Sequence, residues 1–257
     1  MSLLLAPVRF LYNLYALITF VAIMLLVFPF AVGASFFGRI KGGNMILRLC
    51  MFWADTWFPL VFIYPIKIFE APHDKQKPYV FVTNHISYLD SALLVKAFRQ
   101  PVRPLGKVEM ARIPVFGFIY SKAIVTVDRS SAENRVQSIR ILRSIISKGI
   151  SVLVFPEGTF NNSGQALKDF YDGAFRVAIE TQTPVKPVLF LDNYDRLNYH
   201  SFFSLTPGKN RIIYLEEVPI TGYRLEDTAQ LKQKVFDIMK DKLIEYRASW
   251  IEAPTST

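Results

Sequence analysis

A histidine and an aspartate five residues apart are the main candidates for chemistry in this 257-residue chain. On a regular helix, five residues correspond to about 500° of rotation, so the side chains of His85 and Asp90 would diverge by about 140°. If His85 instead precedes a helix and Asp90 lies in its first turn, the carboxylate points back toward the imidazole. A histidine oriented by an aspartate is the general base of acyl-transfer chemistry. The spacing therefore makes His85 a candidate base and Asp90 its candidate orienting group.

Two other interpretations of these residues stay open. Ser87 and Asp90 have the spacing of a helix capping box, in which case His85 is an ordinary loop histidine. His85, Asp90 and Glu157 together could hold a metal ion, although no second histidine lies within reach by sequence. The single cysteine, Cys50, excludes an internal disulfide and any CxxC metal site.

Polar residues follow two β-rich runs at the points where strands should end. Residues 79–83 run into Asn84 and His85, and residues 151–155 run into Pro156 and Glu157. If both runs are parallel strands of one sheet, their carboxyl ends share an edge, which is where open α/β sheets bind ligands. We therefore expect His85 and Glu157 at the same edge.

The chain after residue 66 alternates between short β-branched or aromatic runs and segments of helical period. The expected strands are 66–69, 79–83, 102–105, 124–127, 151–155, 185–190 and 211–215, and the expected helices are 88–98, 131–148, 169–181 and 227–250. Ser130 and Glu133 form a capping box before the second of these helices, and Gly149 closes it. The alternation predicts an α/β fold with a mostly parallel sheet flanked by helices.

The N-terminal segment is predicted to be a membrane anchor. Residues 10–37 contain no charged side chain, and 28 residues make a helix of roughly 42 Å, against about 30 Å for a bilayer core. Arg9 alone precedes this stretch, whereas three basic residues follow it: Arg39, Lys41 and Arg48. This bias predicts that the rest of the chain lies on the cytoplasmic side. A cleaved signal peptide and a pair of buried helices are the alternatives.

A second apolar stretch, residues 44–66, is predicted to be a helix lying at the membrane interface. Arg48 and Asp55 share one helical face, and Trp53 and Trp57 share another. The predicted organisation is a two-helix membrane anchor at 1–64, a catalytic domain at 65–251 and a disordered tail at 252–257.

The chain carries a formal charge of +9, which fits anionic lipid or an anionic substrate. The densest basic run comprises Lys96, Arg99, Arg103, Lys107, Arg112, Lys122 and Arg129. No zinc-finger spacing or RNA-binding signature accompanies it, so no nucleic-acid partner is expected.

Four blocks of this sequence resemble those of the glycerolipid acyltransferase family, the lysophosphatidate (1-acylglycerol-3-phosphate) acyltransferase group. The blocks are Asn84-His85-x4-Asp90, Gly106-Lys107-Val108-Glu109-x4-Pro114-x2-Gly117, Phe155-Pro156-Glu157-Gly158-Thr159 and Pro184-Val185-Lys186-Pro187-Val188. They occur in the family's order, and the family domain would cover about residues 66–220. The resemblance also implies a membrane-associated enzyme with helices before the domain.

The resemblance implies direct transfer of a fatty acyl group from acyl-CoA or acyl-carrier protein to the hydroxyl of a membrane lysophospholipid, 1-acyl-sn-glycerol-3-phosphate. The thioester is a co-substrate, and no other cofactor and no metal is expected. His85 and Asp90 would be catalytic, while Glu157, Gly158 and Thr159 would bind the acceptor. Glu157 could instead be a structural acid bonded to backbone amides.

Two cations are candidates for binding the charged parts of the substrate. Lys107, in the second block, could stabilise the oxyanion or the phosphate. Arg129 follows the strand at 124–127 and is the other phosphate ligand that we expect, with a solvated surface arginine as the alternative.

One residue departs from the family pattern. Many members carry Arg or Ser after the third block, where this chain has Phe160. Arg at that position is associated with the acceptor phosphate, so Phe160 keeps open a lyso-ornithine lipid or another lysolipid as the acceptor. A catalytically inactive lipid-binding protein is the alternative from a different class; the intact His85–Asp90 pair argues against it.

Overall fold

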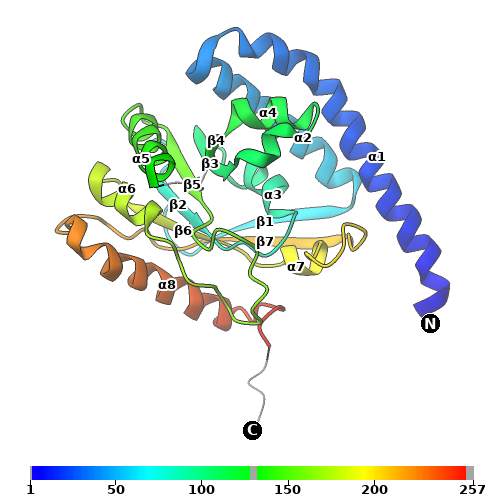
Figure 1. The fold of residues 1–257 in the computed structure, drawn as a ribbon. Coiled ribbons are helices and arrows are strands. Elements are labelled where there is room, and N and C mark those ends of the chain that lie inside the picture. Colours follow the sequence, from blue (N-terminus) through cyan, green and yellow to red (C-terminus); the bar gives the residue numbers. More distant parts are fainter. Residues whose placement is uncertain (1, 128–131, 253–257) are drawn as a thin grey trace.

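A seven-stranded sheet lies between two groups of helices in the computed structural model, which describes residues 2–127 and 132–252 (Figure 1). The strands are β1 (Ile63–Phe69), β2 (Val80–Thr83), β3 (Val102–Lys107), β4 (Val125–Val127), β5 (Ser151–Val154), β6 (Val185–Phe190) and β7 (Gly208–Tyr214). Their order is β1-β7-β6-β2-β5-β3-β4. Five neighbouring pairs are parallel, and β6 and β7 are antiparallel. The predicted α/β fold with a mostly parallel sheet is confirmed.

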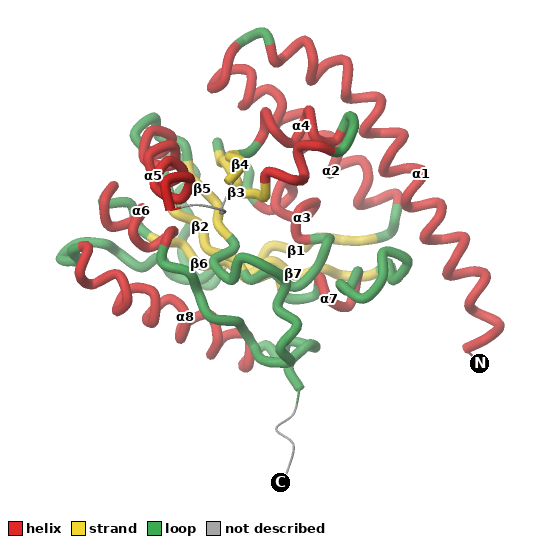
Figure 2. Tube along the Cα trace, in the orientation of Figure 1, coloured by secondary structure: helices red, strands yellow, loops and turns green. Residues whose placement is uncertain are grey.

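The helices occupy both faces of the sheet, as Figure 2 shows. They are α1 (Ser2–Ser35), α2 (Gly43–Leu60), α3 (Asp90–Ala97), α4 (Phe116–Ala123), α5 (Ala132–Ile146), α6 (Gly173–Thr181), α7 (Asn193–Arg196) and α8 (Thr228–Glu245). Three short turns complete the described elements: η1 (Gly38–Gly42), η2 (Val108–Arg112) and η3 (Leu225–Asp227). The sequence predicted α3, α5, α6 and α8, but not the short helices α4 and α7.

The central strands are buried on both sides, as expected for parallel strands covered by helices. In β2, Val80 and Val82 pack in one apolar cluster with α5, α6 and α8. Phe81, between them, packs on the other face with α2 and α3. This alternation follows from the two-residue period of a strand, and it lets β2 pack against helices on both faces of the sheet.

Residues Ala6–Ser35 of α1 form the one helix, among the residues described, that is long and apolar enough to cross a membrane. Many of its apolar side chains are exposed, including Phe10, Leu17 and Leu26. In Figure 1, α1 is the blue helix that runs along the outside of α2, with its N-terminal end projecting from the body of the molecule.

The second apolar stretch differs from its predicted form. The helix α2 ends at Leu60, and β1 begins at Ile63 within the segment predicted to be helical. Trp53 and Trp57 do not face an interface: both are buried, and their indole N–H groups donate to the Phe20 and Ala16 carbonyl oxygens of α1. Their four-residue spacing reflects packing between two helices, because buried indoles need hydrogen-bond acceptors.

Part of the basic run holds elements together. Asp55 of α2 forms ion pairs with Lys96 and Arg99 at the end of α3. The buried Arg103 of β3 donates to the Asn44 side chain at 2.6 Å, and burial lowers its pKa. These three cations therefore dock the N-terminal helices on the sheet rather than lining a substrate site.

Three of the predicted boundaries can be compared with the structure. Because α2 shares one buried apolar cluster with α3 and β2, the helices at 1–64 are packed into the fold; the domain division itself stays a prediction. Ser130 of the predicted capping box lies outside the described residues, whereas Gly149 follows α5 with a φ of +72°. Of the predicted tail, Glu252 is described, and its N–H donates to the Gly164 carbonyl.

Candidate active site

His85 and Asp90 are brought together at the carboxyl end of β2. His85 lies in the loop after the strand, and Asp90 is the first residue of α3. The distance from His85 Nδ1 to Asp90 Oδ2 is 2.7 Å. Because a carboxylate only accepts hydrogen bonds, Nδ1 carries the proton and Nε2 is the basic nitrogen. The pair thus has the geometry of a general base and its orienting group.

Asp90 also caps the loop that contains His85. Its Oδ2 accepts the backbone N–H groups of Ile86 at 2.8 Å and Ser87 at 2.9 Å. The two interpretations of this spacing are therefore compatible, since one buried carboxylate closes the turn and holds the imidazole. The Ser87 hydroxyl contributes separately by accepting from the Leu89 N–H.

Aromatic rings surround the imidazole, whose side chain is 19% exposed. The ring of Phe155 stacks on His85 with centroids 4.2 Å apart, and Phe160 meets it edge-on at 4.5 Å. Phe160 also packs edge-on against Tyr88. The residue that departs from the family pattern is therefore in direct contact with the catalytic candidate.

Glu157 lies at the same edge as His85, as the two strand ends predicted, but its carboxylate is engaged by the backbone. Its Oε1 accepts the His85 N–H at 2.8 Å, and its Oε2 accepts the Lys168 N–H at 2.9 Å. Burial raises the pKa of this carboxyl from 4.5 to about 8, although the two N–H donors act in the opposite direction. This geometry favours the structural acid over direct contact with the acceptor.

A second contact joins the two loops at this edge. The carbonyl oxygen of His85 accepts the Asn161 N–H at 2.7 Å, so both backbone polar groups of His85 bond to the loop after β5. Gly158 in that loop has a φ of +74°, a conformation that costs most other residues about 1–2 kcal/mol. The turn after Glu157 therefore favours glycine, which gives Gly158 a conformational role.

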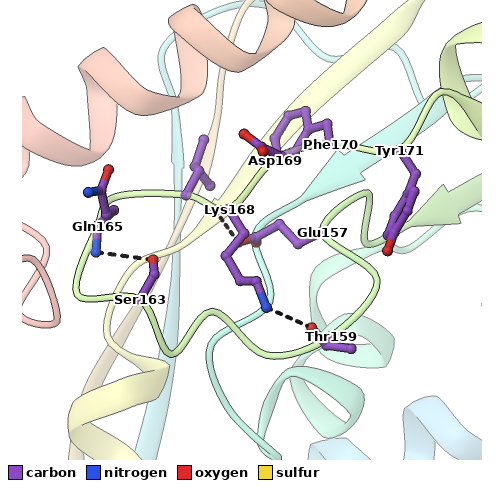
Figure 3. A pocket seen from close by; sticks show the side chains of 9 residues that line it. Glu157, Thr159, Ser163, Gln165, Lys168, Asp169, Phe170 and Tyr171 are labelled. Atoms are coloured by element: carbon purple, nitrogen blue, oxygen red, sulfur yellow. Dashed lines mark hydrogen bonds between the residues drawn. The ribbon is translucent and has the colours of Figure 1, made fainter.

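Beside Glu157 lies a pocket of about 540 Å³ (Figure 3). Its lining residues are Glu157, Thr159, Ser163, Gln165, Leu167, Lys168, Asp169, Phe170 and Tyr171. The Lys168 ammonium donates to the Thr159 hydroxyl at 3.0 Å, and Figure 3 shows the two side chains approaching each other. Lys168 was missed by sequence reasoning because it lies outside the four blocks; its position eleven residues after Glu157 carries no local signal.

Lys107, one of the two predicted cations, is not among the residues that line the pocket. Lys107 is exposed at the carboxyl end of β3, two strands away from β2 across β5. Arg129 lies outside the described residues. Among the residues that are described, no group of three His, Cys, Asp or Glu side chains is placed to hold a metal ion.

Two buried asparagines behind Asp90 also escaped prediction. Asn193 at the start of α7 donates to Asp90 Oδ1 at 2.5 Å, and Asn210 of β7 donates to Asn193 at 2.6 Å. Neither lies in a recognisable motif, and only the folded chain brings them next to Asp90.

Comparison with known proteins shows which proteins this chain resembles. The family model described as Acyltransferase matches residues 67–191. A putative 1-acyl-sn-glycerol-3-phosphate acyltransferase of Caenorhabditis elegans is 26% identical over 215 residues, which cover 83% of this chain and 73% of the relative. The 1-acyl-sn-glycerol-3-phosphate acyltransferase alpha of Homo sapiens is 27% identical over 203 residues, covering 77% and 69%.

A solved structure supports the fold. The crystal structure of the 1-acyl-sn-glycerophosphate (LPA) acyltransferase PlsC from Thermotoga maritima superposes with a TM-score of 0.72 at 24% identity, covering 95% of this chain and 100% of that one. The matched region 67–191 contains His85, Asp90 and the loop after β5. Over residues 67–191 the chain is therefore similar to the Acyltransferase family, and the comparisons support an acyl-transferring enzyme.

Proposed function

We propose that this protein transfers a fatty acyl group from an acyl thioester to the free hydroxyl of 1-acyl-sn-glycerol-3-phosphate, giving phosphatidate. The observation that carries the proposal is the 2.7 Å contact between His85 Nδ1 and Asp90 Oδ2 at the carboxyl edge of the sheet. The names of the similar proteins support this acceptor. The relatives from Caenorhabditis elegans and Homo sapiens are both named as 1-acyl-sn-glycerol-3-phosphate acyltransferases.

The reaction needs one base and no covalent acyl-enzyme. As the acceptor oxygen attacks the thioester carbonyl carbon, His85 Nε2 takes the hydroxyl proton, and Asp90 stabilises the imidazolium that forms. The tetrahedral intermediate then collapses, the C–S bond breaks, and the leaving thiolate takes the proton from Nε2. Cys50 lies in α2, and the mechanism gives it no role as a nucleophile.

The pocket next to Glu157 supports an anionic headgroup. A phosphate gives up hydration when it enters a protein and needs charged or polar donors in exchange. Lys168 and the hydroxyl of Thr159 supply such donors in the described pocket, which the acidic side chains of Glu157 and Asp169 also line. Lys107 at the same edge of the sheet adds positive potential, and Arg129 remains an expected ligand from the sequence.

The N-terminal helix supports a membrane location for the reaction. A lysolipid hydroxyl lies at the bilayer surface, and α1 has the length and composition to hold the site there. The basic residues that follow α1 favour a catalytic domain on the cytoplasmic side, where acyl-CoA or acyl-carrier protein is available as donor.

A lyso-aminolipid such as lyso-ornithine lipid is a second candidate acceptor. It is favoured by Phe160, the departure from the family pattern, whose ring packs edge-on against His85. An aromatic wall next to the base suits a headgroup with less negative charge.

The test is the ratio of kcat/KM for lysophosphatidate to that for uncharged monoacylglycerol, measured with purified protein. The proposal predicts a large ratio that Lys168→Ala lowers about tenfold or more, because a hydrogen bond to a charged group is lost. The control Lys240→Ala removes an exposed lysine of α8 and should leave the ratio unchanged. A ratio near one, or a preference for lyso-ornithine lipid, would contradict the proposed acceptor.

A further inference from the structure

A buried chain of amides continues the His85–Asp90 pair into the protein. Asn193 Nδ2 donates to Asp90 Oδ1 at 2.5 Å, and Asn210 Nδ2 donates to Asn193 Oδ1 at 2.6 Å. All three of these residues are fully buried. Burying a polar side chain has a desolvation cost, so a connected set of buried amides points to a specific structural or catalytic role.

The direction of each bond in this chain is fixed by chemistry. A carboxylate cannot donate, so the nitrogen of the Asn193 amide must face Asp90. The amide oxygen then points away from Asp90 and needs a donor, which Asn210 provides. Asn210 therefore holds the Asn193 amide in the orientation that presents an N–H group to Asp90.

An ion pair holds the two segments that carry Asn193 and Asn210 next to each other. Asp192, directly before Asn193, accepts three hydrogen bonds from Arg211, which directly follows Asn210 in β7. These bonds come from the Arg211 backbone N–H at 2.7 Å, Nε at 2.9 Å and an Nη at 2.7 Å. The start of α7 is thus fastened to β7 at the point where the amides meet.

The two oxygens of Asp90 are held in different ways. Oδ2 accepts from the His85 imidazole and from the backbone of Ile86 and Ser87, whereas the described donor to Oδ1 is Asn193. If Oδ1 loses its donor, the carboxylate can rotate about its Cβ–Cγ bond, and the hydrogen bond to His85 loses its alignment.

We propose that Asn193 and Asn210 are positioning residues for acyl transfer, which keep Asp90 Oδ2 directed at His85 Nδ1. This inference rests on the proposed function, because it assigns the pair its role in the reaction. Asn193 acts through Asp90, and Asn210 acts through Asn193.

The first test replaces Asn193 by Leu, which keeps the approximate size of the side chain and removes the N–H donor, and by Ala. We expect kcat to fall about 10- to 100-fold while KM for the lysolipid stays within about twofold. The acid limb of the kcat/KM profile should move to lower pH, because a misaligned carboxylate stabilises the protonated imidazole less.

The second test follows the amide chain outward. Asn210→Ala should shift kcat and the pH profile in the same direction by a smaller factor. The double variant Asn193→Ala/Asn210→Ala should be no worse than Asn193→Ala alone, because both substitutions act through one contact.

Gln100→Ala is the matched control. Gln100 is another buried amide, which donates to the Ser151 hydroxyl and the Lys77 carbonyl near the start of β5. Its loss should lower the melting temperature but leave kcat and the pH profile unchanged, which separates a positioning effect from a general loss of stability.

A readout without substrate completes the design. In wild-type protein, the proton between His85 Nδ1 and Asp90 should give a downfield proton NMR resonance, which the Asn193 variants should weaken or shift. If folded Asn193→Leu or Asn210→Ala keeps the wild-type resonance, kcat and pH profile, the inference is overturned. If wild-type protein acylates no lysolipid, the proposed function fails, while the resonance still decides whether the asparagines position Asp90.

Discussion

The carboxylate of Asp90 accepts hydrogen bonds from the His85 imidazole, from two backbone N–H groups of the same loop and from Asn193. Each of these donors constrains a different degree of freedom of the base: the tautomer of His85, the shape of its loop and the rotation of the carboxylate. General-base catalysis depends on such positioning, because the proton must move as the acceptor oxygen attacks. At the scale of single residues, the site is therefore ordered before substrate binds.

Glu157 supports His85 from the other side and makes stability depend on pH. Burial raises its pKa from 4.5 to about 8, so between these values the folded protein binds more protons than the unfolded chain. The free energy of unfolding should then fall as pH rises through this window, by up to about 1.4 kcal/mol per pH unit. Glu157→Gln should flatten this dependence.

Thermal unfolding of detergent-solubilised protein between pH 5 and 8 measures the effect. Glu226→Gln, which changes an exposed carboxyl in η3, serves as the control and should keep the wild-type slope. Equal slopes in wild type and Glu157→Gln would show that the buried carboxyl is ionised across this range.

Helices and strands could be predicted from the sequence where the local hydrophobic pattern determines them. All seven strands and the helices α3, α5, α6 and α8 follow from hydrophobic period and turn residues, and the loop positions of His85 and Glu157 follow from the strand ends. The tryptophans of α2 misled us, because the same spacing serves a membrane interface or the packing of one helix on another. Asn193 and Asn210 were out of reach, since they lie more than 100 residues from Asp90 in the chain.

At the level of elements, α1 should determine membrane binding through its exposed face. Ile18 and Leu25 are both exposed in the middle of the helix. Replacing both with Glu should release most of the protein from membranes, since each charge placed in the bilayer interior costs about 2.5–3.5 kcal/mol. The measurement is the fraction that stays in the membrane pellet after carbonate washing.

The control places the same two charges on exposed apolar residues elsewhere. Leu225→Glu with Ile244→Glu, in η3 and α8, should leave the pellet fraction unchanged. If the α1 variant stays in the pellet like wild type, α1 does not anchor the protein.

In the molecule as a whole, α1 reaches the side of the fold where the candidate site lies. Asn13 of α1 exchanges hydrogen bonds with the backbone of Leu205, and Phe10 stacks on Phe203. The neighbouring Phe202 stacks on Tyr88, which packs against Phe160 beside His85. The loop at 198–206 thus connects the apolar helix to the surroundings of the base. A lipid lying along α1 would bring its headgroup close to the site.

The central claim is that His85, held by Asp90, acts as the base in acyl transfer to a lysolipid. The most direct measurement is the initial rate of phosphatidate formation by purified wild type and His85→Ala, with acyl-CoA or acyl-carrier protein as donor and lysophosphatidate as acceptor, followed by mass spectrometry. We expect wild type to form phosphatidate, and His85→Ala to fold normally but to lose at least about 10³-fold in kcat. A folded His85→Ala protein that turns over at the wild-type rate would contradict the account.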